Sequence, residues 1–188
     1  MNQPAPARLG RRAFLGLGLL GGAALALGGV GLALQPGVAR APATPLQALS
    51  PRAFSVLAAV ADRVCPGGEG APGAAEVGVA EKVDALLATS PPTFRTDIEQ
   101  ALLLLENALP GLLLDGRARP FTACDAATQD ATLEAWQTSS LGLRRQVYKG
   151  VRGLVVAAYF GSPETYRSAS GYPGPPDFSS LDRPGDPT

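Results

Sequence analysis

The stretch LGLRRQVYKGVRGLVVAAYF, residues 141–160, carries the longest helical pattern in the chain and decides the fold class. Its apolar residues recur every three or four positions, which is the spacing of one face of an α-helix. Gly150 and Gly153 would let a second helix approach this one closely, at some cost in helix stability. The residues expected on its buried face are Leu143, Val147, Val151, Leu154, Val155, Ala158 and Tyr159.

Four shorter stretches before residue 141 show the same helical spacing. They cover about residues 51–64, 79–88, 92–108 and 126–138. Ser50 and Asp125 are favourable N-cap residues, and Pro51 suits the first position of a helix. The side chains expected to face the core are Phe54, Leu57, Val60, Ala61, Val64, Val83, Leu86, Leu87, Phe94, Ile98, Leu102, Leu105, Leu133 and Trp136.

The third of these helices contains four consecutive leucines, namely Leu102, Leu103, Leu104 and Leu105. They cannot all face one side, because an α-helix turns once in 3.6 residues. The helix is therefore either buried on most of its circumference or presents a leucine strip to another chain. Residues 110–120 are rich in Gly and Pro and are expected to form a connection, with the leucines at 112–114 packed onto the core.

After Phe160 the chain becomes polar and rich in proline, and regular structure is expected to stop. Residues 172–176 are expected to be extended, either as a contact for a partner or as a strap across the domain's own core. The segment in question is Tyr172, Pro173, Gly174, Pro175 and Pro176. Residues 179–188 are expected to be a disordered tail. No stretch alternates long enough to predict a strand, so we expect an all-α, irregular bundle of about five helices after an N-terminal signal or anchor helix.

The N-terminal segment has the features of an export signal. Arg11 and Arg12 precede Phe14 and Leu15, and the chain then carries no charge as far as Leu34. This pattern is typical of a twin-arginine signal, whose translocase carries proteins across the membrane already folded. The alternative is a transmembrane helix whose orientation is set by the flanking arginines. In both interpretations the rest of the chain follows a segment that enters or crosses a membrane. The export signal predicts a periplasmic protein.

Small residues follow the apolar run and suggest cleavage after Ala39, Ala41 or Ala43, although Pro42 should obstruct cleavage after Ala41. An uncleaved segment would instead anchor the protein to the membrane by one helix, and the sequence leaves both outcomes open. The expected organisation is a signal or anchor over residues 1–43, a helical domain over residues 44–178, and the tail.

Composition excludes several functions. All sixteen acidic residues follow Ala41, whereas four of the sixteen basic residues precede it, so the domain is acidic and is not expected to bind nucleic acid. The chain has no histidine and no Gly-rich dinucleotide motif, and we therefore expect no catalytic, metal or cofactor-binding residues in it. Cys65 and Cys124 either form a disulfide in the oxidising periplasm or are two buried apolar side chains.

Four segments together resemble the gluconate 2-dehydrogenase subunit 3 family. They are LSPRAFSVLAAVADRVCPGG (49–68), PGAAEVGVAEKVDALL (72–87), FTACDAATQDATLEAW (121–136) and VVAAYFGSPETYRSASGYPGPP (155–176). Many members of the family have a longer insertion between the Ser-Pro turn, here Ser162-Pro163, and the final Gly-aromatic-Pro-Gly, which begins here at Gly171.

The resemblance implies a non-catalytic small subunit. In that family the small subunit supports the folding of a large FAD-binding dehydrogenase, and its signal exports this partner, which has no signal of its own. The flavin belongs to the large subunit, and a separate cytochrome c usually accepts the electrons. The other hypotheses are a membrane-tethered periplasmic scaffold without a dehydrogenase partner and an enzyme in its own right.

Overall fold

A computed structural model describes residues 29–31, 35–68 and 70–170. Within these residues the chain is helical and contains no strand, which confirms the predicted all-α class. The described bundle has more helices than the five expected. They are α2 (Pro51–Val64), α3 (Val79–Ala88), α4 (Pro92–Glu106), α5 (Ala108–Asp115), the short 3-10 helix η1 (Phe121–Ala123), α6 (Ala126–Gln137), α7 (Gly142–Phe160) and α8 (Pro163–Ser170).

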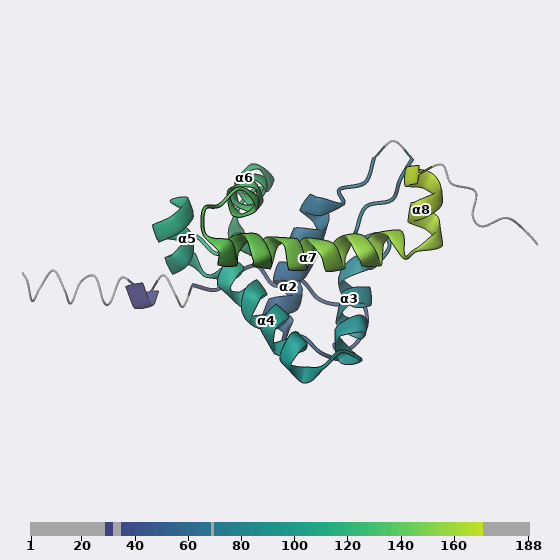
Figure 1. Ribbon diagram of the computed structural model, residues 1–188, viewed down its shortest axis with the longest axis horizontal. Helices are drawn as coiled ribbons and strands as arrows, with labels where there is room; N and C mark the ends of the chain where they lie inside the picture. Colours follow the sequence, from purple (N-terminus) through teal and green to yellow (C-terminus); the bar gives the residue numbers. More distant parts are fainter. Residues whose placement is uncertain (1–28, 32–34, 69, 171–188) are drawn as a thin grey trace, which may run out of the picture.

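Helix α2 lies at the centre of the bundle, in contact with α3, α4, α6 and α7 (Figure 1). The Ser50 side chain accepts a hydrogen bond from the backbone N–H of Ala53, and Pro51 occupies the first helical position, as predicted. Leu49 and Phe54 are both buried, as a hydrophobic staple across the start of a helix requires. The cap and the staple therefore fix the point at which the chain enters the core.

Helix α7 crosses the whole bundle and packs against α2, α3, α4, α6 and α8 (Figure 1). Val151, Val155 and Tyr159 are buried, as the sequence pattern predicted. The Tyr159 hydroxyl donates a hydrogen bond of 2.8 Å to the carbonyl of Pro72, which fastens the loop between α2 and α3 to this helix. Burial, the largest cause, raises the pKa of Tyr159.

Several expected core positions prove to be exposed. Leu143, at the start of α7, is 63% exposed, and Leu86 and Phe94 are also on the surface. Other apolar residues of the same helices are buried, among them Leu87 on α3, Ile98 on α4 and Val151 on α7, so these three side chains lie beside the buried face. No second helix closes onto the two glycines of α7 either, because a Cβ atom added at Gly150 or Gly153 would meet nothing within 4 Å in the described chain.

Two segments expected to be irregular are helices. Residues 108–115 form α5 rather than a connection, and residues 163–170 form α8, where regular structure was expected to have ended. The sequence contains signals for the start or end of a helix in both segments. Pro110 lies in the first turn of α5 and Gly116, with φ at +70°, follows its end. Ser162-Pro163 repeats the Ser-Pro pattern that begins α2.

Helix α4 ends at Glu106, two residues before the expected end, because the chain changes direction there to begin α5. The buried guanidinium of Arg117 donates a hydrogen bond of 2.7 Å to the Leu105 carbonyl and a longer one to the Asn107 carbonyl. A cation that satisfies the last carbonyls of a helix also interacts favourably with the helix dipole. Arg117 therefore fixes the corner between α4 and α5.

Across residues 29–31, 35–68 and 70–170, none of the helices combines the length and the apolar content needed to span a bilayer. The predicted signal residues Arg11, Arg12, Phe14 and Leu15 lie outside the described residues, as do residues 172–176 and the predicted tail. The part of the chain that leads into α2, residues 37–49, runs without helical structure over the bundle.

Candidate interaction surface

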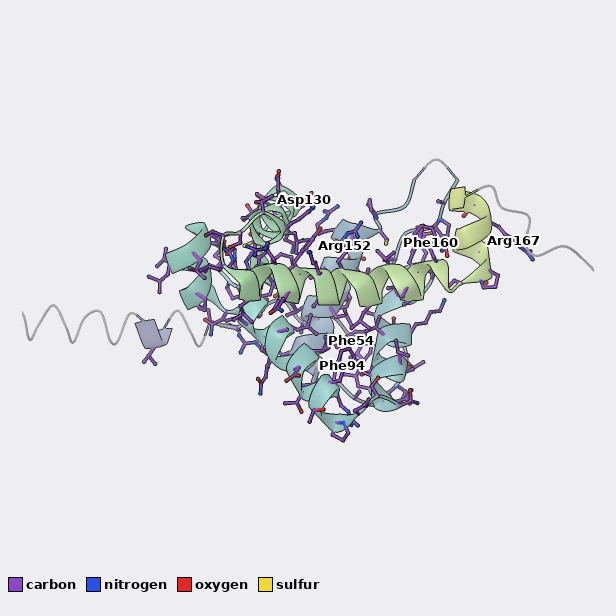
Figure 2. All side chains as sticks on the ribbon, viewed as in Figure 1. Phe54, Phe94, Asp130, Arg152, Phe160 and Arg167 are labelled. Carbon is purple, nitrogen blue, oxygen red and sulfur yellow. The ribbon has the colours of Figure 1, made fainter. Side chains whose placement is uncertain are left out.

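An apolar groove runs between α4 and α7 and has a volume of about 520 Å³. Its apolar walls are formed by Phe94, Ile98 and Leu104 on α4 and by Leu143 and Val147 on α7. Phe94, labelled in Figure 2, is 41% exposed although it is a large aromatic side chain. Exposed aromatic and aliphatic side chains that line a concave surface are typical of sites that contact another protein, not of surfaces that face only solvent.

Helix α5 adds a second group of exposed leucines near the start of α7. Leu113 is 75% exposed, Leu114 is 48% exposed and Leu112 is 40% exposed. The expectation that residues 112–114 pack onto the core was therefore wrong. A helix of eight residues carries three exposed leucines in a row here, a costly arrangement in water unless another surface covers them.

A cluster of three side chains holds α5 in this place. The Asp115 carboxylate accepts hydrogen bonds from the indole N–H of Trp136, at 3.2 Å, and from the guanidinium of Arg144. The Arg144 guanidinium also lies 5.0 Å from the centroid of the Trp136 ring, within range of a cation–π contact. Because the side chains of Asp115 and Arg144 are almost fully buried, the pair is shielded from water. The cluster joins the end of α5 to α6 and to the start of α7, so the α5 leucines and Leu141 and Leu143 lie at one end of the molecule (Figure 1).

We call this region the apolar surface and define it as the groove together with the exposed leucines of α5 and Leu141. Five leucines of this surface were not predicted to be exposed, namely Leu112, Leu113, Leu114, Leu141 and Leu143. For the three leucines of α5, the signal in the sequence is the pairing of Pro110 near the start and Gly116 after the end of a short apolar stretch, which marks a helix too short to bury its whole circumference.

The predicted contact residues on α4 divide into two pairs. Leu102 and Leu105 are buried in the core, which excludes them from a contact surface. Leu103 and Leu104 are partly buried and pack against the core, and Leu104 also lines the groove. The four leucines are therefore buried or partly buried, whereas the first half of the same helix is exposed at Phe94 and Asp97, so neither alternative describes the whole of α4. The other predicted contact residues, at 172–176, lie outside the described residues.

Both cysteines are free thiols in the structure, so the predicted alternative of a disulfide is not formed. Cys65 is buried at the end of α2, and burial is the largest cause of the raised pKa of its thiol, against the opposing effect of Arg152. Cys124 donates a hydrogen bond to the Pro120 carbonyl. Burial also raises the pKa of the Cys124 thiol, while Arg117 lowers it. The two thiols thus have different charged neighbours, since Arg152 belongs to α7 and Arg117 lies in the loop between α5 and η1.

In the part of the chain that the structure describes, no three residues of the types His, Cys, Asp and Glu are grouped so as to hold a metal ion. The leading candidates for a binding site are therefore the apolar groove and the exposed leucines beside it. These side chains are suited to pack against the apolar surface of a partner and to exclude water from the contact.

Comparison with known proteins identifies the family to which this chain belongs. The sequence profile of the family described as Gluconate 2-dehydrogenase subunit 3 matches residues 51–174, which extend from the start of α2 past the end of α8. The chain belongs to this family, whose name describes an accessory subunit of a dehydrogenase complex. Searches of curated proteins and of solved structures found no match.

Proposed function

We propose that this chain is the non-catalytic small subunit of a periplasmic dehydrogenase. It binds a large FAD-dependent subunit that oxidises a sugar, a sugar acid or an alcohol, stabilises it, and exports it through the twin-arginine signal at its own N-terminus. The FAD belongs to the partner, and a cytochrome c subunit accepts the electrons. The observation that carries the proposal is the apolar surface, in a chain that belongs to a family of accessory subunits.

The exposed apolar side chains of this surface favour a permanent partner. Burying apolar surface stabilises a complex by about 25 cal/mol per Å² removed from water. Leu113, Leu143 and Phe94 each expose a large share of an apolar side chain, so covering them with one partner surface would contribute several times the energy of a single contact. Obligate interfaces are larger and more apolar than transient ones, and a permanent subunit suits this surface better than an occasional partner does.

Export of the complex follows from the order of events that the sequence predicts. A twin-arginine translocase carries folded cargo, so a partner without its own signal can cross the membrane if it is already bound to this chain. Stable binding before export requires an interface that persists through the translocation step. The proposed apolar interface meets this requirement because its dissociation would expose the leucines to water again.

The alternative function is a helical scaffold, tethered to the periplasmic side of the membrane, that acts without a dehydrogenase partner. The predicted anchor helix and the acidic domain are compatible with it. Purification of the native protein separates the two functions, because only the first predicts that a flavin-containing subunit is isolated together with this chain.

The test of export uses the double substitution Arg11→Lys and Arg12→Lys in cells that also produce the flavin subunit. Lysine keeps the charge but not the planar guanidinium, so both proteins should be absent from the periplasmic fraction. Arg8→Lys, just upstream of the pair, is the matched control and should leave export unchanged. Normal periplasmic amounts of both proteins in the double variant would contradict the proposed route.

The segment at residues 172–176 is tested separately. If it contacts the partner, Tyr172→Ala should weaken the complex, because aromatic anchors at interfaces contribute about 2 kcal/mol or more, and should leave the melting temperature of the isolated chain unchanged. A lowered melting temperature with normal recovery of the flavin subunit would instead assign this segment to the domain's own fold.

A further inference from the structure

The N-terminal strap, which we define as residues 37–49, is fastened to the bundle through its backbone. The backbone N–H of Val38 donates a hydrogen bond of 2.9 Å to the Thr122 hydroxyl, and that of Arg40 donates one of 2.9 Å to the Ser55 hydroxyl. Further along, the N–H of Ala43 donates to the Glu81 carboxylate at 3.2 Å. The acceptors come from η1, α2 and α3, so the strap crosses three elements that are distant in sequence.

The strap begins at Gly37, where any larger residue would collide with side chains of the bundle unless they moved. A Cβ atom on Gly37 would overlap both Glu106 Oε1 and Thr122 Oγ1. Glu106 is itself buried, and its carboxylate accepts hydrogen bonds from both the N–H and the hydroxyl of Thr122. The backbone at Gly37 therefore rests directly on a buried carboxylate that Thr122 holds by two hydrogen bonds.

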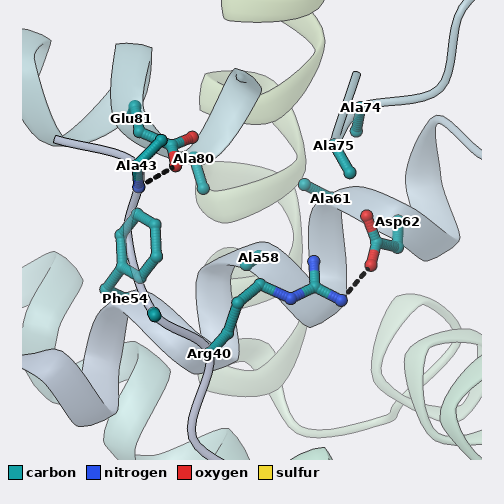
Figure 3. A pocket seen from close by; sticks show the side chains of 11 residues that line it. Arg40, Ala43, Phe54, Ala58, Ala61, Asp62, Ala74, Ala75, Ala80 and Glu81 are labelled. Atoms are coloured by element: carbon teal, nitrogen blue, oxygen red, sulfur yellow. Dashed lines mark hydrogen bonds and ion pairs between the residues drawn. The ribbon is translucent and has the colours of Figure 1, made fainter. Parts of the chain in front are cut away.

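The side chain of Arg40 provides a further attachment. Its guanidinium lies 2.6 Å from the carboxylate of Asp62. Figure 3 shows the Arg40 side chain extended along α2 toward Asp62, with the Ala43 to Glu81 hydrogen bond on the other side of Phe54. Together they bridge a cavity of about 240 Å³ lined largely by alanines. Beyond it, three N–H groups at residues 47–49 bind the carboxylate of Asp84.

All three cleavage positions that the sequence suggests, after Ala39, Ala41 and Ala43, lie within this strap. A peptidase binds an extended segment by hydrogen bonds to its backbone, and the N–H groups of Val38, Arg40 and Ala43 are already engaged by the domain. Cleavage therefore requires the strap to detach first. Each hydrogen bond of ordinary net strength reduces the detached fraction by about fivefold, so the three together reduce it by roughly a hundredfold.

We propose that residues 37–43 are retained in the exported protein as part of its fold, and that any removal of the signal occurs before Gly37. This inference rests on the proposed export of an already folded chain, because only a folded chain reaches the translocase with the strap in place.

The test is the N-terminus of the native protein, purified from the periplasmic and membrane fractions and measured by intact mass and N-terminal peptide sequencing. We expect the first residue to be Gly37 or one before it. A start at Arg40, Pro42 or Thr44 in an exported, properly assembled protein would overturn the inference and leave the proposed function intact. Absence of the protein from both fractions would contradict the proposed export itself.

A second experiment measures the strap directly by limited trypsin digestion of the full-length protein. Cleavage after Arg40 should be slow in the native protein and at least tenfold faster in Gly37→Ala, whose new methyl group cannot coexist with the Glu106 carboxylate in its present place. The matched control is Gly153→Ala, where the added Cβ meets nothing within 4 Å. Trypsin should cleave this variant after Arg40 at the same rate as the native protein. Rapid cleavage after Arg40 in the native protein would overturn the inference, whether or not Gly37→Ala remains folded.

Discussion

Asp84 Oδ1 accepts a hydrogen bond of 2.8 Å from the backbone N–H of Leu49, and both residues are buried. The same carboxylate accepts the N–H groups of Gln47 and Ala48. Three consecutive backbone donors thus converge on one side chain of α3 immediately before α2 begins. This arrangement holds the strap against α3 and sets the position at which Ser50 caps α2.

We predict that Asp84→Ala destabilises the isolated domain by about 3 kcal/mol or more. The change leaves buried N–H groups without an acceptor, and each hydrogen bond to a charged group contributes about 1.5–3 kcal/mol. Urea unfolding followed by circular dichroism measures the effect. Asp97→Asn, an exposed carboxylate on α4, is the control and should change stability by less than about 0.5 kcal/mol. Equal stability of the Asp84 variant and the native protein would show that the three bonds contribute little.

The cluster of Asp115, Trp136 and Arg144 leads to a second prediction. Asp115→Ala leaves the buried Arg144 guanidinium without its carboxylate, a change that costs about 3–5 kcal/mol in comparable buried pairs. Melting of the variant should be lowered accordingly. Asp130→Ala breaks the more exposed pair with Arg63, in which the Asp130 side chain is 56% exposed, and should cost about 0–1 kcal/mol. Similar losses in both variants would mean that burial of the Asp115 pair has no special energetic weight.

The apolar surface is tested by charge. Leu113→Glu and Leu143→Glu should each reduce recovery of the flavin subunit at least tenfold, because a carboxylate in an apolar interface must be desolvated. The melting temperature of the small subunit alone should stay the same, since both side chains are exposed. Leu86→Glu, at an exposed leucine on α3 away from α5, is the control and should leave the complex intact (Figure 1). Full recovery with both interface variants would place the partner elsewhere.

Both cysteines should be alkylated after unfolding without any reductant, because they are free thiols in the structure. In the folded protein at neutral pH, iodoacetamide should react slowly with each of them. Burial raises the pKa of both thiols. The reactive thiolate is therefore scarce at neutral pH, and its fraction increases only at alkaline pH. The mass of the protein after timed alkylation gives both results. A mass that increases only after reduction would indicate a disulfide.

The cap of α6 gives a prediction about acid. Asp125 accepts hydrogen bonds from Thr128, whose effects lower the pKa of this carboxyl below 3.8. A lowered pKa in the folded state means that the stabilisation is complete above the unfolded value and disappears as the pH falls through the folded value. Asp125→Asn keeps a capping oxygen but does not titrate. The difference in unfolding free energy between the two proteins should therefore be constant above about pH 5 and shrink below pH 3.8. A difference that stays constant down to pH 2 would contradict this assignment.

Local signals in the sequence predicted the regular part of the fold well. Ser50-Pro51 located the start of α2, Asp125 located the cap of α6, and the helical spacing gave the bounds of α3 without error. These features succeed because capping and amphipathic spacing depend on residues within one or two turns of each other. The same local signals also mark α5 and α8, where the density of Gly and Pro led to the prediction of irregular chain.

The sequence by itself determined the helical class and the resemblance to an accessory subunit, since both are patterns along the chain. Only the tertiary structure decided which leucines face water. Leu102 is buried and Leu113 is exposed although both stand in runs of consecutive leucines, because burial depends on the neighbours that a fold brings to each side of a helix. The docking of Gly37 onto Glu106 was likewise beyond local pattern, since these residues meet only when α4 and η1 are in place. Contacts between residues distant in sequence are fixed by packing, which no single stretch of sequence records.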